Sequence, residues 1–105
     1  MKPFEIFIAY VAWQGGGKSR PILVISSDSK VVRAFRITSK YDSKSTQIQN
    51  QYFEIKDWQT AGLVQKSYID TICPANLPVK YIIGNTPIGK LSENDKQRLI
   101  QFLSK

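Results

Sequence analysis

Short runs of β-branched and aromatic residues, separated by turn-forming residues, occupy most of this chain and restrict it to a fold built from strands. Runs at residues 4–13, 21–26 and 31–39 have the composition of strands. In the third run polar and apolar side chains alternate imperfectly with a period of two. Further strands are predicted at 52–55 and, as two short strands around prolines, within 66–84. The pattern therefore predicts a mainly β fold.

The segments between these runs are rich in glycine and polar residues. QGGGKSR, at residues 14–20, predicts a flexible loop, because glycine leaves φ unrestricted. A tight turn is expected at 27–30 and an exposed polar loop at 40–51. Residues 56–64 favour one or two helical turns with Asp57 as the N-cap.

The end of the chain, residues 91–105, has the features of an amphipathic helix. Ser92 is a suitable N-cap, and Glu93 and Asp95 complement the positive end of the helix dipole. The predicted apolar face consists of Leu99, Ile100, Phe102 and Leu103. We therefore predict one domain, residues 1–105, that forms a small, twisted antiparallel β-barrel with a C-terminal helix packed on it.

The sequence GGGKS resembles the end of a nucleotide-binding phosphate loop, but its context excludes that function. Such a loop needs a first glycine five positions before the second, and counting back from Gly17 gives Ala12. It also needs a helix directly after the lysine, whereas RPILVIS follows here and predicts a strand. The glycine run is therefore interpreted as a loop between strands.

The residue inventory excludes several classes of site. The chain has no histidine and a single cysteine, Cys73, so neither a zinc site nor an internal disulfide is expected. No apolar run approaches the ~20 residues that cross a membrane, and one unpaired cysteine suits a reducing cytoplasm. The net charge of +7 favours a polyanionic partner, although it can also serve solubility alone.

Arg20 is the first candidate functional residue, since it stands where the glycine loop meets a rigid strand. Lys18 beside it adds a second positive charge that could contact a phosphate. The alternative is an ordinary surface arginine in an ion pair. Trp13 and Trp58 are more typical of a core than of platforms for nucleobases.

A second group of candidates lies at the end of the third predicted strand. Hydroxyls of Thr38 and Ser39 can hydrogen-bond phosphate oxygens, and the Tyr41 ring could stack on a base. Threonine and serine at strand ends also commonly cap turns, so both interpretations stay open.

Five segments in this order resemble the MazF/PemK family of toxin endoribonucleases. They are the opening strand with its glycine-rich loop, RPILVIS, ITS, AGLVQKSYID and IGKLSENDKQRLIQFL. Together they cover nearly the whole chain. The resemblance implies an SH3-like barrel of the MazF/PemK/CcdB type, a homodimer, a cytoplasmic toxin that cuts single-stranded RNA at short sequences, and an acidic antitoxin partner.

The resemblance also assigns residues. Arg20 matches the arginine of the family's RP motif and Thr38 matches its strand-end threonine, and in similar proteins these two form the catalytic pair. RNA supplies its own nucleophile, the 2′-OH, so neither a metal nor a cofactor is required. The enzyme must stabilise charge on the phosphoryl oxygens, for which an arginine fork is well suited. Contacts to RNA are expected from Gln14, Gly17, Lys18, Ser39, Lys40 and Tyr41.

Two other functions fit the same composition. A basic β-barrel could bind RNA or a protein without cutting, as related toxins that poison DNA gyrase do. It could also be a small structural subunit of a larger assembly. Metal-independent cleavage of RNA would separate the nuclease from both.

Overall fold

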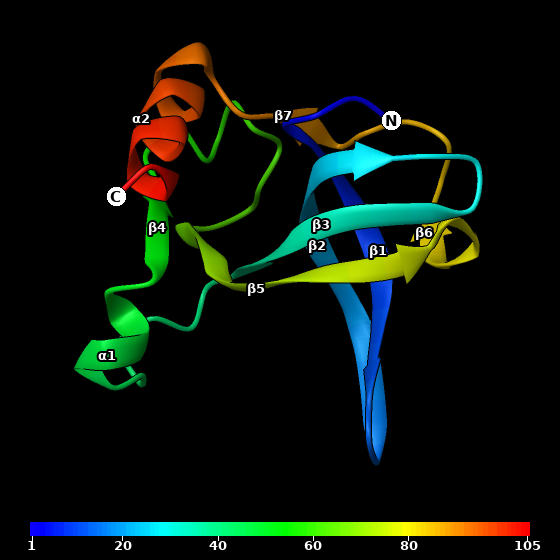
Figure 1. The fold of residues 1–105 in the computed structure, drawn as a ribbon, viewed down its shortest axis with the longest axis horizontal. Coiled ribbons are helices and arrows are strands. Elements are labelled where there is room, and N and C mark those ends of the chain that lie inside the picture. Colours follow the sequence, from blue (N-terminus) through cyan, green and yellow to red (C-terminus); the bar gives the residue numbers. More distant parts are fainter.

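A curled antiparallel sheet with one C-terminal helix forms the body of the protein (Figure 1). The computed structural model describes residues 1–105 except for the side chain of Trp13. The prediction that Trp13 lies in the core therefore falls outside the described residues. Seven strands form this sheet. This confirms the predicted mainly β architecture with a C-terminal helix, in which the sheet curls as a half-barrel.

The elements in chain order are β1 (Glu5–Trp13), β2 (Gly16–Ser27), β3 (Val31–Thr38), α1 (Thr46–Gln49), β4 (Tyr52–Ile55), β5 (Ser67–Pro78), a 3₁₀ helix (Val79–Tyr81), β6 (Ile82–Ile83), β7 (Gly89–Lys90) and α2 (Glu93–Leu103). The spatial order of the strands in the sheet is β4-β5-β3-β2-β1-β6, and β7 pairs with β1. Across the described part of the chain, no helix is both long and apolar enough to cross a membrane.

The two faces of the sheet carry different cores, because alternate strand residues point to opposite sides. One face, which we call the helix face, packs its apolar residues against Leu99 of α2. Its buried strand residues include Ile6, Leu23, Phe35, Ile37, Phe53, Ile55 and Ile69. The opposite face, which we call the distal face, has a smaller core of Phe7, Ala9, Ile22, Val24, Val32 and Ala34. Beyond this core, the distal face carries polar side chains that include Arg20, Arg36 and Thr38.

The expected loop at residues 14–20 is wrong, because most of it belongs to a long β1–β2 hairpin. Backbone pairing continues from Ile6 opposite Leu23 to Trp13 opposite Gly16, and only Gln14 and Gly15 form the turn. Gly15 has a φ of 85°, which glycine adopts without strain. Cross-strand hydrogen bonds thus offset the conformational entropy that the glycines lose when they are ordered. Figure 1 shows the outer hairpin extending as an arm from the sheet.

Other predicted connections also differ in detail. The polar segment 40–51 contains the short helix α1, for which Ser45 is the N-cap. Residues 56–64 form turns rather than a helix, and the Asp57 carboxylate accepts a hydrogen bond from Ser92 Oγ (2.6 Å) instead of capping. The strand β5 is longer than predicted, because a register shift near Pro74 lets the strand continue past a residue without an N–H.

The helix α2 begins as predicted, but only part of its apolar face is buried. The Ser92 hydroxyl accepts a hydrogen bond from Asp95 N (3.1 Å), which confirms the N-cap. Leu99 is buried and Phe102 packs edge-on against Phe53, whereas Ile100 and Leu103 remain exposed. The helix touches the sheet along one narrow stripe, so two of the four predicted face residues lie outside it. Trp58 packs against the same core, as expected.

Asp95 joins α2 to the end of β4 and is fully buried. Its carboxylate accepts hydrogen bonds from the backbone N–H groups of Asp57 (2.8 Å) and Lys56 (3.3 Å). Arg98 Nη1 also donates to it (2.6 Å). Asp95 therefore has a structural function beyond the dipole effect predicted from the sequence.

Candidate functional site

Strand pairing places Arg20 and Thr38 beside each other on the distal face. The β2–β3 register pairs Ile22 with Arg36, and continuing it by two residues along each strand puts Arg20 opposite Thr38. Directly opposed residues point to the same side of a sheet. Both side chains are half-buried, beyond the edge of the distal core. The two predicted catalytic residues, far apart in the sequence, are thus brought together.

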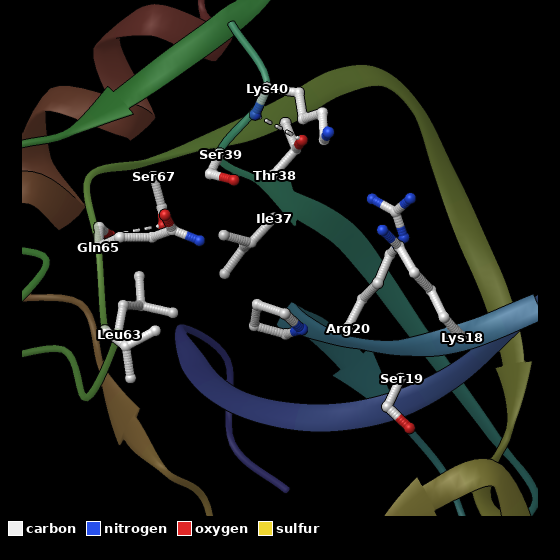
Figure 2. Close-up of a pocket in the computed structure, with 12 residues that line it drawn as sticks. Lys18, Ser19, Arg20, Ile37, Thr38, Ser39, Lys40, Leu63, Gln65 and Ser67 are labelled. Carbon is white, nitrogen blue, oxygen red and sulfur yellow. Dashed lines mark hydrogen bonds between the residues drawn. The ribbon is translucent and has the colours of Figure 1, made fainter.

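Two adjoining cavities open around this pair. The first, of about 220 Å³, is lined among others by Lys18, Ser39 and Gln65. The second, of about 250 Å³, is lined by Val11, Arg36, Lys44, Tyr52 and Asp70. Both cavities are also lined by Arg20, Thr38 and Lys40. In Figure 2 the side chains of Lys18 and Arg20 extend from β2 toward the side on which Thr38 lies.

The cations of this region have no anionic partner among the described side chains. The ion pairs of the described residues are Lys66–Glu54 (3.6 Å) and Arg98–Asp95 (2.6 Å), both away from Arg20. No described side chain therefore holds Arg20 in a surface ion pair, and the alternative interpretation of this residue is wrong. A guanidinium without a carboxylate partner keeps its donors available for a phosphate.

Thr38 has a capping function that leaves part of its hydroxyl free. Its Oγ1 accepts a hydrogen bond from the backbone N–H of Lys40 (3.1 Å), as expected for a strand-end threonine. This contact uses the oxygen as an acceptor, so the O–H can still donate to a second group. The same contact fixes Oγ1 at the mouth of both cavities, which suits a donor to a bound phosphate oxygen.

Tyr52 and Asp70 add polar groups that sequence reasoning missed. The two residues are directly opposed across β4 and β5, and both line the second cavity with Arg20. Burial, followed by the Asp70 charge, raises the pKa of Tyr52, while the positive charge of Arg20 acts in the opposite direction. Tyr52 therefore stays a neutral phenol at physiological pH, able to donate or accept a hydrogen bond.

The predicted RNA-contacting residues divide into two groups. Lys18, Ser39 and Lys40 line the cavities. Gln14 and Gly17 do not: Gln14 lies in the hairpin turn and Gly17 pairs with Ala12 inside the arm.

Tyr41 stacks on Tyr68, with ring centroids 4.3 Å apart and planes inclined by 11°. One face of the Tyr41 ring is therefore already occupied by a protein side chain. A base could use only its other face. The ring centroid of Tyr52 lies 6.5 Å from that of Tyr41.

Arg36 is the missed residue that the sequence could have revealed. It stands two positions before Thr38 in a strand with alternating faces, so the same pattern that placed Thr38 also placed Arg36. Lys44, by contrast, reaches the second cavity from the 40–51 segment, where no periodicity predicts direction.

No family model matches the chain, and no curated protein matches it. The resemblance to the MazF/PemK family thus rests on the sequence motifs. Independently of it, the geometry presents unpaired cations, a fixed hydroxyl and one carboxylate around a shared opening. This arrangement can bind a phosphodiester and stabilise negative charge that develops on it.

Proposed function

We propose that this protein is a metal-independent endoribonuclease toxin of the MazF/PemK type that cuts single-stranded RNA. The proposal rests on one observation: Arg20 and Thr38 line the same two cavities, and no described side chain forms an ion pair with Arg20. The motifs RPILVIS and ITS, which suggested these residues, supply the second line of support.

The reaction forms a bond between the 2′-oxygen and phosphorus and breaks the bond from phosphorus to the 5′-oxygen. Arg20 donates to two phosphoryl oxygens and stabilises their increased charge in the transition state. The Thr38 hydroxyl donates to the same phosphate and helps to align it with the 2′-oxygen. A 2′,3′-cyclic phosphate and a 5′-hydroxyl are the products.

Proton transfer is the second requirement of this reaction. Asp70 is the carboxylate among the described residues that line the two cavities, and we assign it as acceptor of the 2′-OH proton. A guanidinium stays protonated at pH 7 and is a poor base, so Arg20 acts as an electrostatic group. The leaving 5′-oxygen takes a proton from water at the open mouth of the site.

The remaining features of the proposal concern fold family and partners. We infer an SH3-like barrel and a homodimer, by analogy with the family that the motifs resemble. We also infer an acidic antitoxin, since a net charge of +7 and a cluster of cations at the site favour a polyanionic chain. Such a partner would cover the surface that RNA uses.

Arg20→Ala tests the assignment directly. Loss of its charge should remove about 3 kcal/mol of transition-state stabilisation, a decrease of roughly a hundredfold in the cleavage rate. The assay is cleavage of a long single-stranded RNA in EDTA. Arg33→Ala is the matched control, because Arg33 lies on the same strand as Thr38 but is exposed on the helix face.

Full activity of Arg20→Ala, or equal losses in the two variants, would contradict the assignment. A second candidate function is supported by the same unpaired cations: a module that binds RNA or a protein without cutting. Binding of RNA by the wild-type protein, with no cleavage in any buffer, would favour that alternative.

A further inference from the structure

The second cavity carries more positive charge than one phosphate requires. Four cationic side chains line it, Arg20, Arg36, Lys40 and Lys44, together with the single carboxylate of Asp70. A phosphodiester bears one negative charge, and Arg20 with Thr38 already provides its contacts in the proposed reaction. The charges of Arg36 and Lys44 are therefore left without a function in that reaction.

Strand geometry fixes where Arg36 lies relative to the catalytic pair. Arg36 and Thr38 are two positions apart on β3, hence on the same face and roughly 7 Å apart along the strand. Across the sheet, Arg36 is opposed by Asp70 and Asp70 by Tyr52, so the three form a row parallel to the row of Arg20 and Thr38. The two rows are spaced like successive phosphates on an extended RNA strand.

Arg36 is available for a ligand rather than held by the protein. Among the described side chains it makes no ion pair, not even with Asp70, its cross-strand neighbour. The described hydrogen bond of the Asp70 side chain is with the backbone N–H of Ile72, which donates to Oδ1 (3.0 Å). Because Arg36 is half-buried and lines an open cavity, its guanidinium donors stay available to an anion.

We propose that Arg36, with Lys44, forms a second phosphate subsite that binds the RNA phosphate next to the scissile one. This inference rests on the proposed RNA-cleaving function. Arg36 binds the neighbouring phosphate through its planar fork, and Lys44 adds a second charge at the rim of the cavity. The scissile phosphate and this second phosphate flank one nucleotide, so the two subsites together hold the RNA strand on both sides of it. That nucleotide, which carries the attacking 2′-OH or lies next to the one that does, is thereby fixed in the cavity.

The test uses short RNAs that span the mapped cut site, with a 2′-deoxy residue at the cut so that binding is measured without cleavage. In two versions, one of the phosphates flanking the cut is replaced by a neutral methylphosphonate. One of these replacements should weaken binding to the wild-type protein about tenfold. Arg36→Ala should bind the unmodified RNA about tenfold more weakly and lose its sensitivity to that replacement.

Three controls make the result specific. Arg33→Ala, on the opposite face of β3, should behave as the wild type. Arg36→Lys should regain part of the affinity, and thermal unfolding of each variant shows whether it folds.

Equal sensitivity of Arg36→Ala and the wild type to both replacements would overturn the subsite and leave the proposed function intact. Absence of any RNA binding or cleavage by the wild type would overturn the proposed function, and the subsite with it.

Discussion

Replacement of Asp95 by alanine should destabilise the protein by about 3 kcal/mol. The carboxylate is fully buried and accepts hydrogen bonds from the backbone N–H groups of Lys56 and Asp57. Alanine leaves both donors without this acceptor, at about 1–3 kcal/mol for each unsatisfied buried group. The lost ion pair with Arg98 adds little, because the Arg98 side chain is 31% exposed and water can replace the carboxylate.

Thermal unfolding provides the assay. A loss of about 3 kcal/mol in a domain of this size lowers Tm by roughly 12–24 °C. Glu93→Ala is the control, since Glu93 is an exposed acid in the same first turn of α2 and shares only the dipole effect, of about 0.3–1 kcal/mol. Equal shifts in the two variants would refute the conclusion that Asp95 anchors the helix to β4.

Changes at four further positions, Thr38, Tyr52, Arg20 and Gly89, test other parts of the structure. Thr38→Ser should keep most of the RNA-cleaving activity and Thr38→Val should lose about a hundredfold in kcat, because only serine retains the hydroxyl donor; equal activities would exclude Thr38 from the chemistry. The raised pKa of Tyr52 means that the folded protein holds the phenolic proton more tightly than the unfolded chain does. Its contribution to stability is complete below the ordinary pKa of 10.0 and is lost as the pH rises through the higher folded value, so Tyr52→Phe should flatten the alkaline part of the stability curve measured in urea. Arg20→Ala should raise the Tyr52 pKa further in a spectroscopic titration, and an unchanged value would contradict their proximity. Gly89→Ala should cost at least about 2 kcal/mol, because the added methyl group meets the Ala61 carbonyl, whereas Gly84→Ala meets open space and should cost only the roughly 1–2 kcal/mol of its positive φ.

Local sequence patterns predicted the elements whose signal lies in residues close together in the chain. The run RPILVIS and the strand ending at Thr38 were recognised from composition and alternation, and Ser92 from its position before an amphipathic segment. Each of these depends on residues that are neighbours in the chain. The pairing that brings Arg20 to Thr38 follows once β2 and β3 form a hairpin, so the centre of the site was also predictable.

The rest depended on contacts between distant segments. Glycine composition favoured a loop at 14–20, but pairing with the other strand of the hairpin holds these residues in β2. Asp57 had the local features of an N-cap, yet its carboxylate binds Ser92 from α2. Lys44 and Asp70 meet in one cavity only because β5 returns beside β3. Such placements require the tertiary fold.

In the proposed reaction the RNA 2′-OH is the nucleophile, and no metal is needed. The most direct measurement is cleavage, in EDTA, of two RNAs that differ by one 2′-deoxy substitution at the mapped cut nucleotide. We predict that the unmodified RNA gives fragments with 2′,3′-cyclic phosphate and 5′-hydroxyl ends, and that the substituted RNA stays intact at that position. Cleavage of the substituted RNA at the same rate, or dependence of cleavage on an added divalent ion, would contradict the proposed mechanism.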